Sequence, residues 1–245
     1  MSNTLIIIPS RMSATRLPGK PLLKIKGRAI ISHVFKKAKE CNIGKVLVAA
    51  EDKVIVNEVK KSGGNAVLTS KKHKSGTDRI WEAYQKVKNK NVKYIINLQG
   101  DEPLIDVKDI RNLNKIVKKY KLHIGTLALN LKNKKNFKNK SLVKVITEKK
   151  IDYKYPQKAI HFKRILKKNS KFVYHHVGIY QYSVETLKKF YYLKRTRNER
   201  KNKLEQLRAL DNKIPIHVVL AKKNVVGIDT RQDYIELKKI MEYKA

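Results

Sequence analysis

Strand-like and helix-like segments alternate through the first 130 residues, and this alternation is the strongest constraint on the fold. Apolar runs suited to strands occur at residues 5–8, 46–50, 66–69, 94–98 and 124–129. Stretches suited to helices lie between them, at residues 29–41, 53–62, 77–88 and 107–120. This order predicts an α/β fold: a doubly wound, mostly parallel sheet with helices on both faces.

The pattern changes after residue 130. Residues 132–140 are polar and basic and predict a loop, whereas residues 141–147 and 172–182 are rich in strand formers. Helical periodicity returns at residues 184–194 and 200–212, followed by a strand at 216–220 and a helix at 231–243. We expect a single domain over residues 1–245. Its parts are an α/β core (1–130), a smaller β-rich lobe (131–195) and a return to the core (196–245).

A cationic loop follows the first strand and carries Arg11, Arg16 and Lys20, together with Pro18 and Gly19. A loop that joins a parallel strand to a helix is where α/β proteins bind anions. Arginine forks, a lysine and free backbone amides suit a triphosphate. The spacing is not that of a Walker A loop, so the sequence predicts a polyphosphate site of another kind.

Two carboxylates follow later strand-like runs. Asp101 comes after residues 94–98, and Asp229 precedes the last predicted helix. One interpretation is helix capping, by an Asp or Glu of the first segment for the helix from Val107 and by Asp229 or Thr230 for the last helix. The other is that the two carboxylates hold Mg²⁺ beside the triphosphate, which suits metal-assisted transfer of a nucleotidyl group.

Small residues and an arginine mark the start of the third predicted helix. Ser75, Gly76 and Thr77 would place backbone amides there, and Arg79 adds a planar fork of donors. Both features offer hydrogen-bond donors to a ligand. The alternative is a Ser or Thr cap, with Arg79 paired to a surface acid.

The formal net charge of +38 raises the possibility of a nucleic-acid-binding protein. Only 11 of the 58 basic residues are arginine, and the lysines are spread along the predicted helices. We therefore expect a solvated Lys-rich surface with no specific nucleic-acid partner. The single Cys41 and the lack of a long apolar run predict a cytoplasmic protein without a membrane partner.

Six groups of segments along the chain form an ordered set. They are Pro9-Ser10-Arg11 with Thr15-Arg16-Leu17-Pro18-Gly19-Lys20-Pro21-Leu22, His73-x-Ser75-Gly76-Thr77-Asp78-Arg79, Asn97-x-Gln99-Gly100-Asp101-Glu102-Pro103, His176-Val177-Gly178-Ile179-Tyr180, Leu204-Glu205-Gln206-Leu207-Arg208 and Asp229-Thr230. In this set and order, over nearly its whole length, the chain resembles the CMP-Kdo synthetases (3-deoxy-manno-octulosonate cytidylyltransferases).

The resemblance implies a fold of the nucleotide-diphospho-sugar transferase type. It also implies that CTP and 3-deoxy-manno-octulosonate (Kdo) give CMP-Kdo and pyrophosphate, with Mg²⁺, for lipopolysaccharide synthesis. A homodimer that associates through the β-rich lobe is implied as well.

The family motifs also assign roles to residues of this chain. The implied catalytic residues are Arg11, Lys20, Asp101 and Asp229, of which the two aspartates are metal ligands. The implied CTP-binding residues are Ser10, Arg11, Arg16, Lys20, Ser75, Gly76 and Arg79. The implied sugar-binding residues are Gln99, Lys158, His176, Tyr180, Glu205 and Gln206. Read without the resemblance, His176 and Tyr180 could be packing residues of a strand, and Glu205 could be half of a surface ion pair.

One segment departs from the family pattern. Where the family has Tyr-Phe-Ser-Arg, this chain has Tyr155-Pro156-Gln157-Lys158, and lysine lacks the bidentate fork that suits a carboxylate. Lys158 could act as a weaker clamp, Lys163 or Arg164 could substitute, or the accepted sugar could be 8-amino-Kdo or a sialic-type acid. A basic nucleic-acid-binding protein on this fold and an inactive CTP sensor are the remaining alternatives.

Overall fold

The computed structural model describes residues 2–13, 16–87, 89–131, 137–166, 171–223 and 227–243. The chain divides into two compact units, which we call unit 1 (Met1–Lys108 with Val225–Ala245) and unit 2 (Asp109–Asn224). The sequence pattern places the corresponding boundaries at residues 130 and 195. The structure groups residues 109–130 with unit 2, because helix α4 (Val107–Lys119) packs closely on strand β7 (Ile124–Asn130).

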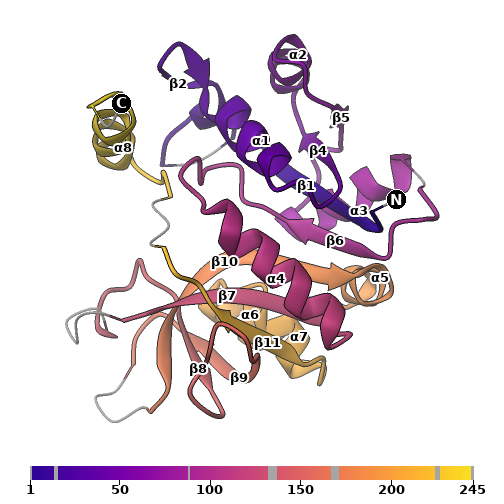
Figure 1. The fold of residues 1–245 in the computed structure, drawn as a ribbon, viewed down its shortest axis with the longest axis vertical. Helices are drawn as coiled ribbons and strands as arrows, with labels where there is room; N and C mark the ends of the chain where they lie inside the picture. Colours follow the sequence, from indigo (N-terminus) through magenta and orange to yellow (C-terminus); the bar gives the residue numbers. More distant parts are fainter. Residues whose placement is uncertain are drawn as a thin grey trace. The chain divides into compact units, whose positions relative to one another are not determined.

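Four parallel strands form the sheet of unit 1 (Figure 1). They are β5 (Ala66–Leu68), β4 (Lys45–Ala50), β1 (Thr4–Ser10) and β6 (Tyr94–Asn97), in that spatial order. Ile6, Ile7 and Ile8 of β1 are fully buried, as expected for a parallel strand covered on both faces. The four predicted strands are confirmed, and their carboxyl ends lie at one edge of the sheet.

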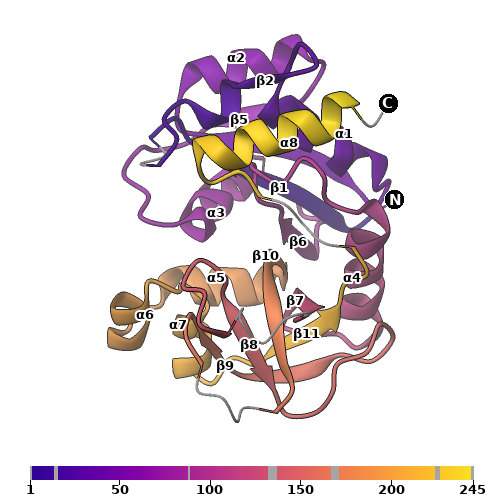
Figure 2. The same cartoon turned by 90° about the vertical axis from the view of Figure 1, so that its left-hand side faces the viewer.

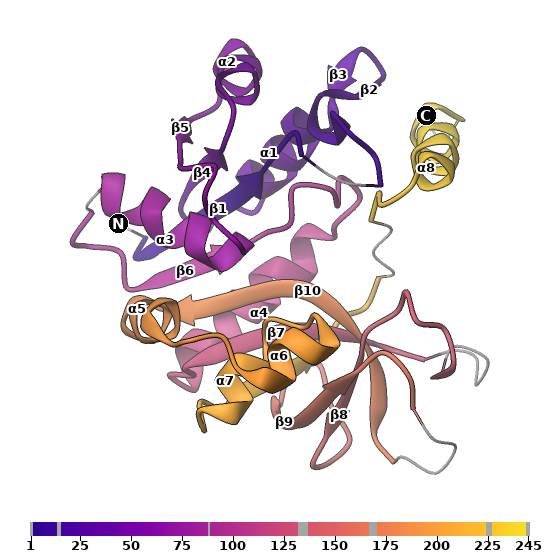
Figure 3. The same ribbon diagram turned by 180° about the vertical axis from the view of Figure 1, so that it is seen from behind.

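Helices cover both faces of this sheet. Figures 1 and 3 show α1 (Ile30–Glu40) on one face and α3 (Gly76–Val87) on the other, and α2 (Lys53–Lys61) packs beside α1. The predicted helices are confirmed, although Lys88 lies outside the described residues.

The carboxyl-terminal helix α8 (Arg231–Tyr243) also belongs to unit 1 (Figure 2). The hydroxyl of Tyr234 donates to the carbonyl of Lys24 at 2.7 Å. Lys24 belongs to a hairpin of two short strands, β2 (Lys24–Ile25) and β3 (Arg28–Ala29). The helix is confirmed, whereas the sequence pattern missed this hairpin because strands of two residues carry no periodicity.

Five strands of unit 2 pair in a closed circuit. The order is β10 (Val173–Ser183), β7, β11 (Ile216–Leu220), β9 (Gln157–Lys163) and β8 (Lys144–Thr147), and β8 also pairs with β10. Among these pairs only β7 and β11 run parallel. The β-rich character is confirmed, but β9 was not predicted because its basic and polar residues hide the alternation.

The helices of unit 2 contain one correction. Helix α5 (Val184–Tyr192) is confirmed, but the single helix predicted at residues 200–212 is wrong. The structure has two short helices, α6 (Arg197–Asn202) and α7 (Leu207–Asp211). Lys203 between them adopts a left-handed backbone with φ of 52°, and neither glycine nor proline marks this break in the sequence. Of the loop predicted at residues 132–140, residues 132–136 lie outside the described residues.

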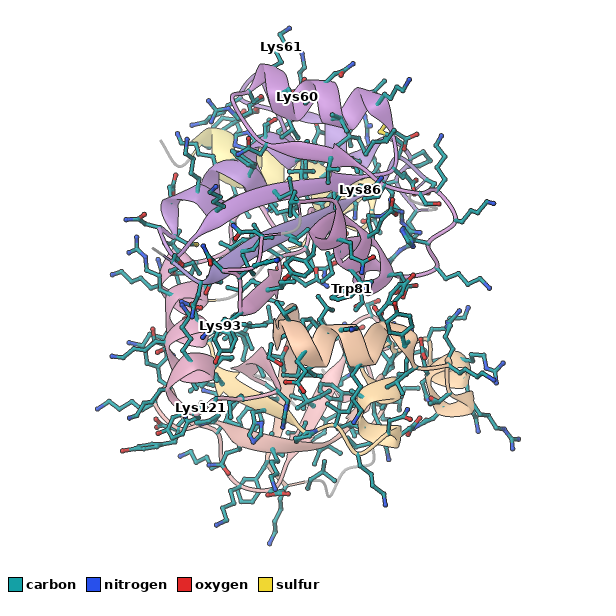
Figure 4. The ribbon with its side chains drawn as sticks, turned by 90° about the vertical axis from the view of Figure 1, so that its right-hand side faces the viewer. Lys60, Lys61, Trp81, Lys86, Lys93 and Lys121 are labelled. Atoms are coloured by element: carbon teal, nitrogen blue, oxygen red, sulfur yellow. The ribbon has the colours of Figure 1, made fainter. Side chains whose placement is uncertain are left out.

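Basic side chains extend away from the ribbon, including Lys60 and Lys61 of α2 in Figure 4. Both lysines are exposed, as expected for a solvated surface. Within the described residues, no helix is long and apolar enough to cross a membrane.

Candidate active site

The loop after β1 folds back on itself at the carboxyl edge of unit 1. The amide of Gly19 donates to the carbonyl of Met12 at 3.1 Å, and its φ of 71° suits glycine. Lys20 then begins a short 3₁₀ helix, η1 (Lys20–Leu22). Arg11 is exposed, and the buried Ser10 hydroxyl has no hydrogen-bond partner among the described residues. The loop therefore offers cations and an unused hydroxyl at a strand end.

Lys20 joins this loop to both predicted metal ligands. Its Nζ lies 2.6 Å from Oδ2 of Asp101 and 3.6 Å from Oδ1 of Asp229, and it donates to the carbonyl of Ile228. Arg16 pairs with Asp229 at 3.0 Å. The structure thus brings together two predicted triphosphate cations and two predicted carboxylates, and we call these four side chains the charge cluster.

Helix capping does not account for the carboxylates of the charge cluster. Asp106 accepts the amide of Lys108 and so caps α4. Thr230 caps α8, because its hydroxyl accepts the Asp233 amide while the Asp233 carboxylate accepts the Thr230 amide. The capping interpretation is therefore right for Thr230, whereas the Asp101 and Asp229 carboxylates face cations.

Glu102 adds a third carboxyl group that sequence reasoning did not single out. Burial, together with Asp101 and Asp229, raises the pKa of Glu102 to about 8, although Lys20 opposes the shift. Its Oε2 is buried without a hydrogen-bond partner among the described residues. In the sequence, Glu102 was marked by its place in the motif Asn97–Pro103, beside Asp101 and after a buried strand.

These residues fit a divalent cation that is bound partly by a nucleotide. Within the described residues, no group of three or more His, Cys, Asp or Glu side chains is arranged to hold a metal by itself. Mg²⁺ commonly takes one or two carboxylates and completes its shell with water and substrate phosphates. Asp101 and Asp229 would be the protein's contribution to such a site.

The predicted nucleotide segment at α3 is also well defined. The Ser75 hydroxyl accepts the amide of Asp78 at 3.1 Å and so caps the helix that begins at Gly76. Arg79 is 3% exposed and its Nη2 lies 2.7 Å from Oε2 of Glu51. The expected pairing of Arg79 with an acid is present, but the pair is buried rather than on the surface.

Gln99 follows β6 at the same edge. It is partly buried, and its amide donates to Oδ1 of Asn97 at 3.3 Å. At the next residue, a Cβ on Gly100 would lie 2.9 Å from the carbonyl oxygen of Pro9. The absence of a side chain at Gly100 therefore lets the chain leaving β6 pass close to the end of β1.

His176 and Tyr180 lie together on β10 of unit 2, with ring centroids 5.3 Å apart. His176 Nε2 is 3.0 Å from the hydroxyl of Thr126, and the ring of Phe162 packs edge-on at 5.0 Å. Burial, with a contribution from His175, lowers the pKa of His176 to about 3. Burial also raises the pKa of Tyr180. Both side chains are neutral at pH 7 and can hydrogen-bond to sugar hydroxyls.

Glu205 and Gln206 lie in the turn between α6 and α7, and both are partly buried. Oε1 of Glu205 is 3.7 Å from Nη2 of Arg208. Arg208 is buried and makes two bonds to the Glu199 carboxylate, at 2.8 and 2.7 Å. Glu205 is thus attached to a buried ion pair rather than to a surface one.

Lys158 is exposed on β9, opposite His217 of β11. Lys163 is exposed as well. The Arg164 guanidinium donates to the backbone carbonyl of Lys140 at 3.2 Å. Of the candidates for a sugar-carboxylate clamp, the two lysines are therefore the more accessible to a ligand.

Comparisons with known proteins agree with these motifs. The cytidylyltransferase family model matches residues 5–220. A 3-deoxy-manno-octulosonate cytidylyltransferase of Thermodesulfovibrio yellowstonii is 42% identical, covering 94% of both chains. The corresponding enzyme of Elusimicrobium minutum is 40% identical, covering 98% of both. The chain belongs to the 3-deoxy-manno-octulosonate cytidylyltransferase family.

Solved structures confirm the fold predicted from the family motifs. A CMP:2-keto-3-deoxy-manno-octonic acid synthetase complexed with CTP has a TM-score of 0.90 and 32% identity, covering all of both chains. A UDP-glucose pyrophosphorylase complexed with UDP-glucose has a TM-score of 0.72 at 13% identity, which shows likeness of fold alone. The nucleotidyltransferase-type α/β fold is therefore confirmed.

Proposed function

We propose that this protein transfers CMP from CTP to Kdo, giving CMP-Kdo and pyrophosphate for lipopolysaccharide synthesis. The observation that carries the proposal is the charge cluster, in which Lys20 contacts Asp101 and Asp229 at the edge of a parallel sheet. Its residues come from three separated family motifs. A triphosphate arriving at this cluster would meet both cations for its oxygens and carboxylates for an accompanying metal.

The reaction is an in-line displacement at phosphorus. The anomeric hydroxyl of the sugar attacks the α-phosphorus of CTP, and the bond from this phosphorus to the departing pyrophosphate breaks. Arg11, Arg16 and Lys20 would bind and orient the triphosphate, so that positioning and electrostatics supply most of the acceleration. Asp101 and Asp229 would hold Mg²⁺, which supplies neutralisation of phosphate charge when bound.

The sugar acid would be recognised by neutral and charged groups together. His176 and Tyr180 offer an imidazole and a phenol, and Glu205 and Gln206 add hydrogen-bonding groups. Lys158 supplies a positive charge for the sugar carboxylate. The buried setting of His176 supports this assignment, because a neutral imidazole can both donate and accept hydrogen bonds.

The direct test is pyrophosphate release by purified protein with Mg²⁺ and CTP, with and without Kdo. We expect release that requires Kdo and is lost when UTP or ATP replaces CTP. Release without any sugar, or none with Kdo, would contradict the proposal. Omission of Mg²⁺ with a chelator present should abolish turnover.

Lys158 favours a second candidate, the same reaction on another acid sugar. Because lysine is the less specific carboxylate clamp, 8-amino-Kdo and a sialic-type acid belong in the same assay. A higher kcat/KM for either acid than for Kdo would show that this acid is the preferred substrate. Binding of CTP with no turnover of any of these sugars would favour a CTP sensor.

We also infer a cytoplasmic homodimer. Unit 2 exposes Ile160, Ile165 and Phe172, whose apolar side chains a second copy could cover. We expect light scattering to give twice the 28.5 kDa mass of one chain and Ile160→Glu to shift it toward the monomer. A monomeric native protein would contradict the dimer.

A further inference from the structure

A single buried carboxylate, that of Glu51, connects the loop after β1 to the start of α3. Glu51 is the first residue after β4 and is 7% exposed. Its Oε1 accepts the hydroxyl of Ser13 at 2.7 Å. Its Oε2 accepts Nη2 of Arg79 at 2.7 Å. Each carboxylate oxygen thus holds a different segment, and the motifs that carry the family resemblance do not include Glu51.

Neighbouring bonds fix both ends of this connection. The Glu51 amide donates to the carbonyl of Ser10 at 3.3 Å, and Asp52 Oδ2 accepts the amide of Met12 at 3.3 Å. On the other side, Nη1 of Arg79 donates to the hydroxyl of Thr69 at 2.8 Å. The carboxyl ends of β1, β4 and β5 are therefore tied to α3 through one ion pair.

We propose that Glu51 is a positioning residue for CTP. It holds the cationic loop and the first turn of α3 in fixed positions relative to each other before the nucleotide binds. This inference rests on the proposed function, since both segments were assigned to CTP. Arg79 is buried against Glu51, so it would act by holding α3 in place rather than by touching the nucleotide. A loop that is already ordered loses less freedom on binding, which increases affinity.

Ser13 provides the cleanest test, because its exposed side chain can be changed without disturbing the buried Glu51–Arg79 pair. We expect Ser13→Ala to raise the Kd for Mg²⁺ and CTP, measured by equilibrium dialysis without sugar, about tenfold. The melting temperature should stay within about 1 °C of wild type, as for a surface substitution. Ser13→Thr keeps the hydroxyl and should restore the wild-type Kd. An unchanged Kd in Ser13→Ala would overturn the proposal.

Glu51→Gln tests the carboxylate itself, and Glu199→Gln is its matched control in the buried Glu199–Arg208 pair. Both substitutions should lower the melting temperature, because each removes the charge of the carboxylate closest to a buried arginine. Only Glu51→Gln should weaken CTP binding, by about tenfold or more. Equal weakening in both variants, or none in Glu51→Gln, would show that the pair only stabilises the fold.

Direct binding also separates this inference from the proposed function. Suppose that the wild-type protein binds CTP but does not turn over Kdo, and that Ser13→Ala weakens CTP binding. These results would refute the proposed reaction and support the role of Glu51. Wild-type protein that does not bind CTP would refute both. Kdo-dependent turnover with CTP binding unaffected by Ser13→Ala and Glu51→Gln would refute the positioning role alone.

Discussion

Among the described residues, each unit has a buried Glu–Arg ion pair, and the two pairs differ in how far apart in sequence their partners lie. Glu51 and Arg79 come from different elements, 28 residues apart, and the pair extends to the loop after β1. Glu199 and Arg208 are nine residues apart on consecutive short helices, and Arg208 also lies over the ring of Phe190 at 4.7 Å. The first pair connects distant segments, whereas the second stiffens a local turn.

This contrast follows from how each unit places its candidate ligand residues. In unit 1 the carboxyl ends of the parallel strands all lie at one edge of the sheet, so side chains distant in sequence lie close together there. In unit 2 the candidate residues lie on antiparallel strands and in the turn after Lys203. Burial, more than nearby charge, lowers the pKa of His176 among them. Unit 1 thus gathers its candidate residues in the charge cluster, whereas the candidate residues of unit 2 combine the buried neutral His176 with the charged Lys158 and Glu205.

The largest expected effect is on the charge cluster of unit 1. Asp101→Asn should lower kcat about 1,000-fold, or about 4 kcal/mol, because the amide cannot neutralise a cation there. Folding should be nearly unaffected. The measurement is pyrophosphate release at saturating Mg²⁺, with Asp106→Asn as the control because asparagine also caps helices. Activity of Asp101→Asn within tenfold of wild type would remove Asp101 from the metal site.

The second prediction concerns the local pair of unit 2. Glu199→Gln should cost about 3 kcal/mol of unfolding free energy, because the Arg208 guanidinium is 2% exposed and loses the charge of its closest carboxylate. It should also raise the KM for Kdo, since Arg208 lies beside Glu205, while leaving the KM for CTP unchanged. Urea unfolding and steady-state kinetics check both parts. If Glu199→Gln raised only the KM for CTP, the ion pair of unit 2 would act on the nucleotide and not on the sugar, which would contradict this comparison.

The third prediction tests the burial of His176. Its pKa is about 3 in the folded protein and about 6.5 when unfolded, so the unfolded chain binds more protons between these values. Stability from this group is therefore present above pH 6.5 and is lost as pH falls, by about 2 kcal/mol from pH 7 to pH 5. Urea unfolding at the two pH values measures the loss. His176→Gln should show a smaller loss, and an equal loss would contradict the buried neutral imidazole.

The smallest expected effect belongs to the exposed Lys158. Lys158→Ala should raise the KM for Kdo by up to about tenfold, or about 1.4 kcal/mol, with kcat and the KM for CTP nearly constant. Lys158→Arg restores the family's residue type and should lower the KM for Kdo below wild type. If neither variant changes the KM for Kdo, another cation, such as Lys163, holds the sugar carboxylate.

The sequence predicted unit 1 better than unit 2 for a physical reason. Apolar runs in a parallel sheet are continuous and easily recognised, and the sheet's topology alone brings Lys20 close to Asp101. In unit 2 the break at Lys203 was hidden, because neither glycine nor proline marks it in the sequence.

Buried polar partners were the least predictable part of the site. The sequence around Glu51 and Glu102 does not show that they are buried, although Glu102 lies in the motif beside Asp101. Their burial depends on neighbours that approach only after the sheet has formed. The family motifs pointed to Arg79 but could not show that its guanidinium faces a carboxylate. Such pairings depend on side-chain geometry between strands, which periodicity does not encode.

The contact of Lys20 with the carbonyl of Ile228 and the carboxylate of Asp229 has a consequence for protein synthesis. A ribosome makes Lys20 and Asp101 long before Asp229, so a growing chain can form the sheet of unit 1 while its charge cluster is still incomplete. During that interval Arg16 lacks the Asp229 carboxylate that it pairs with in the finished protein. The nascent protein therefore completes its charge cluster only after residues 227–229 have emerged and folded back.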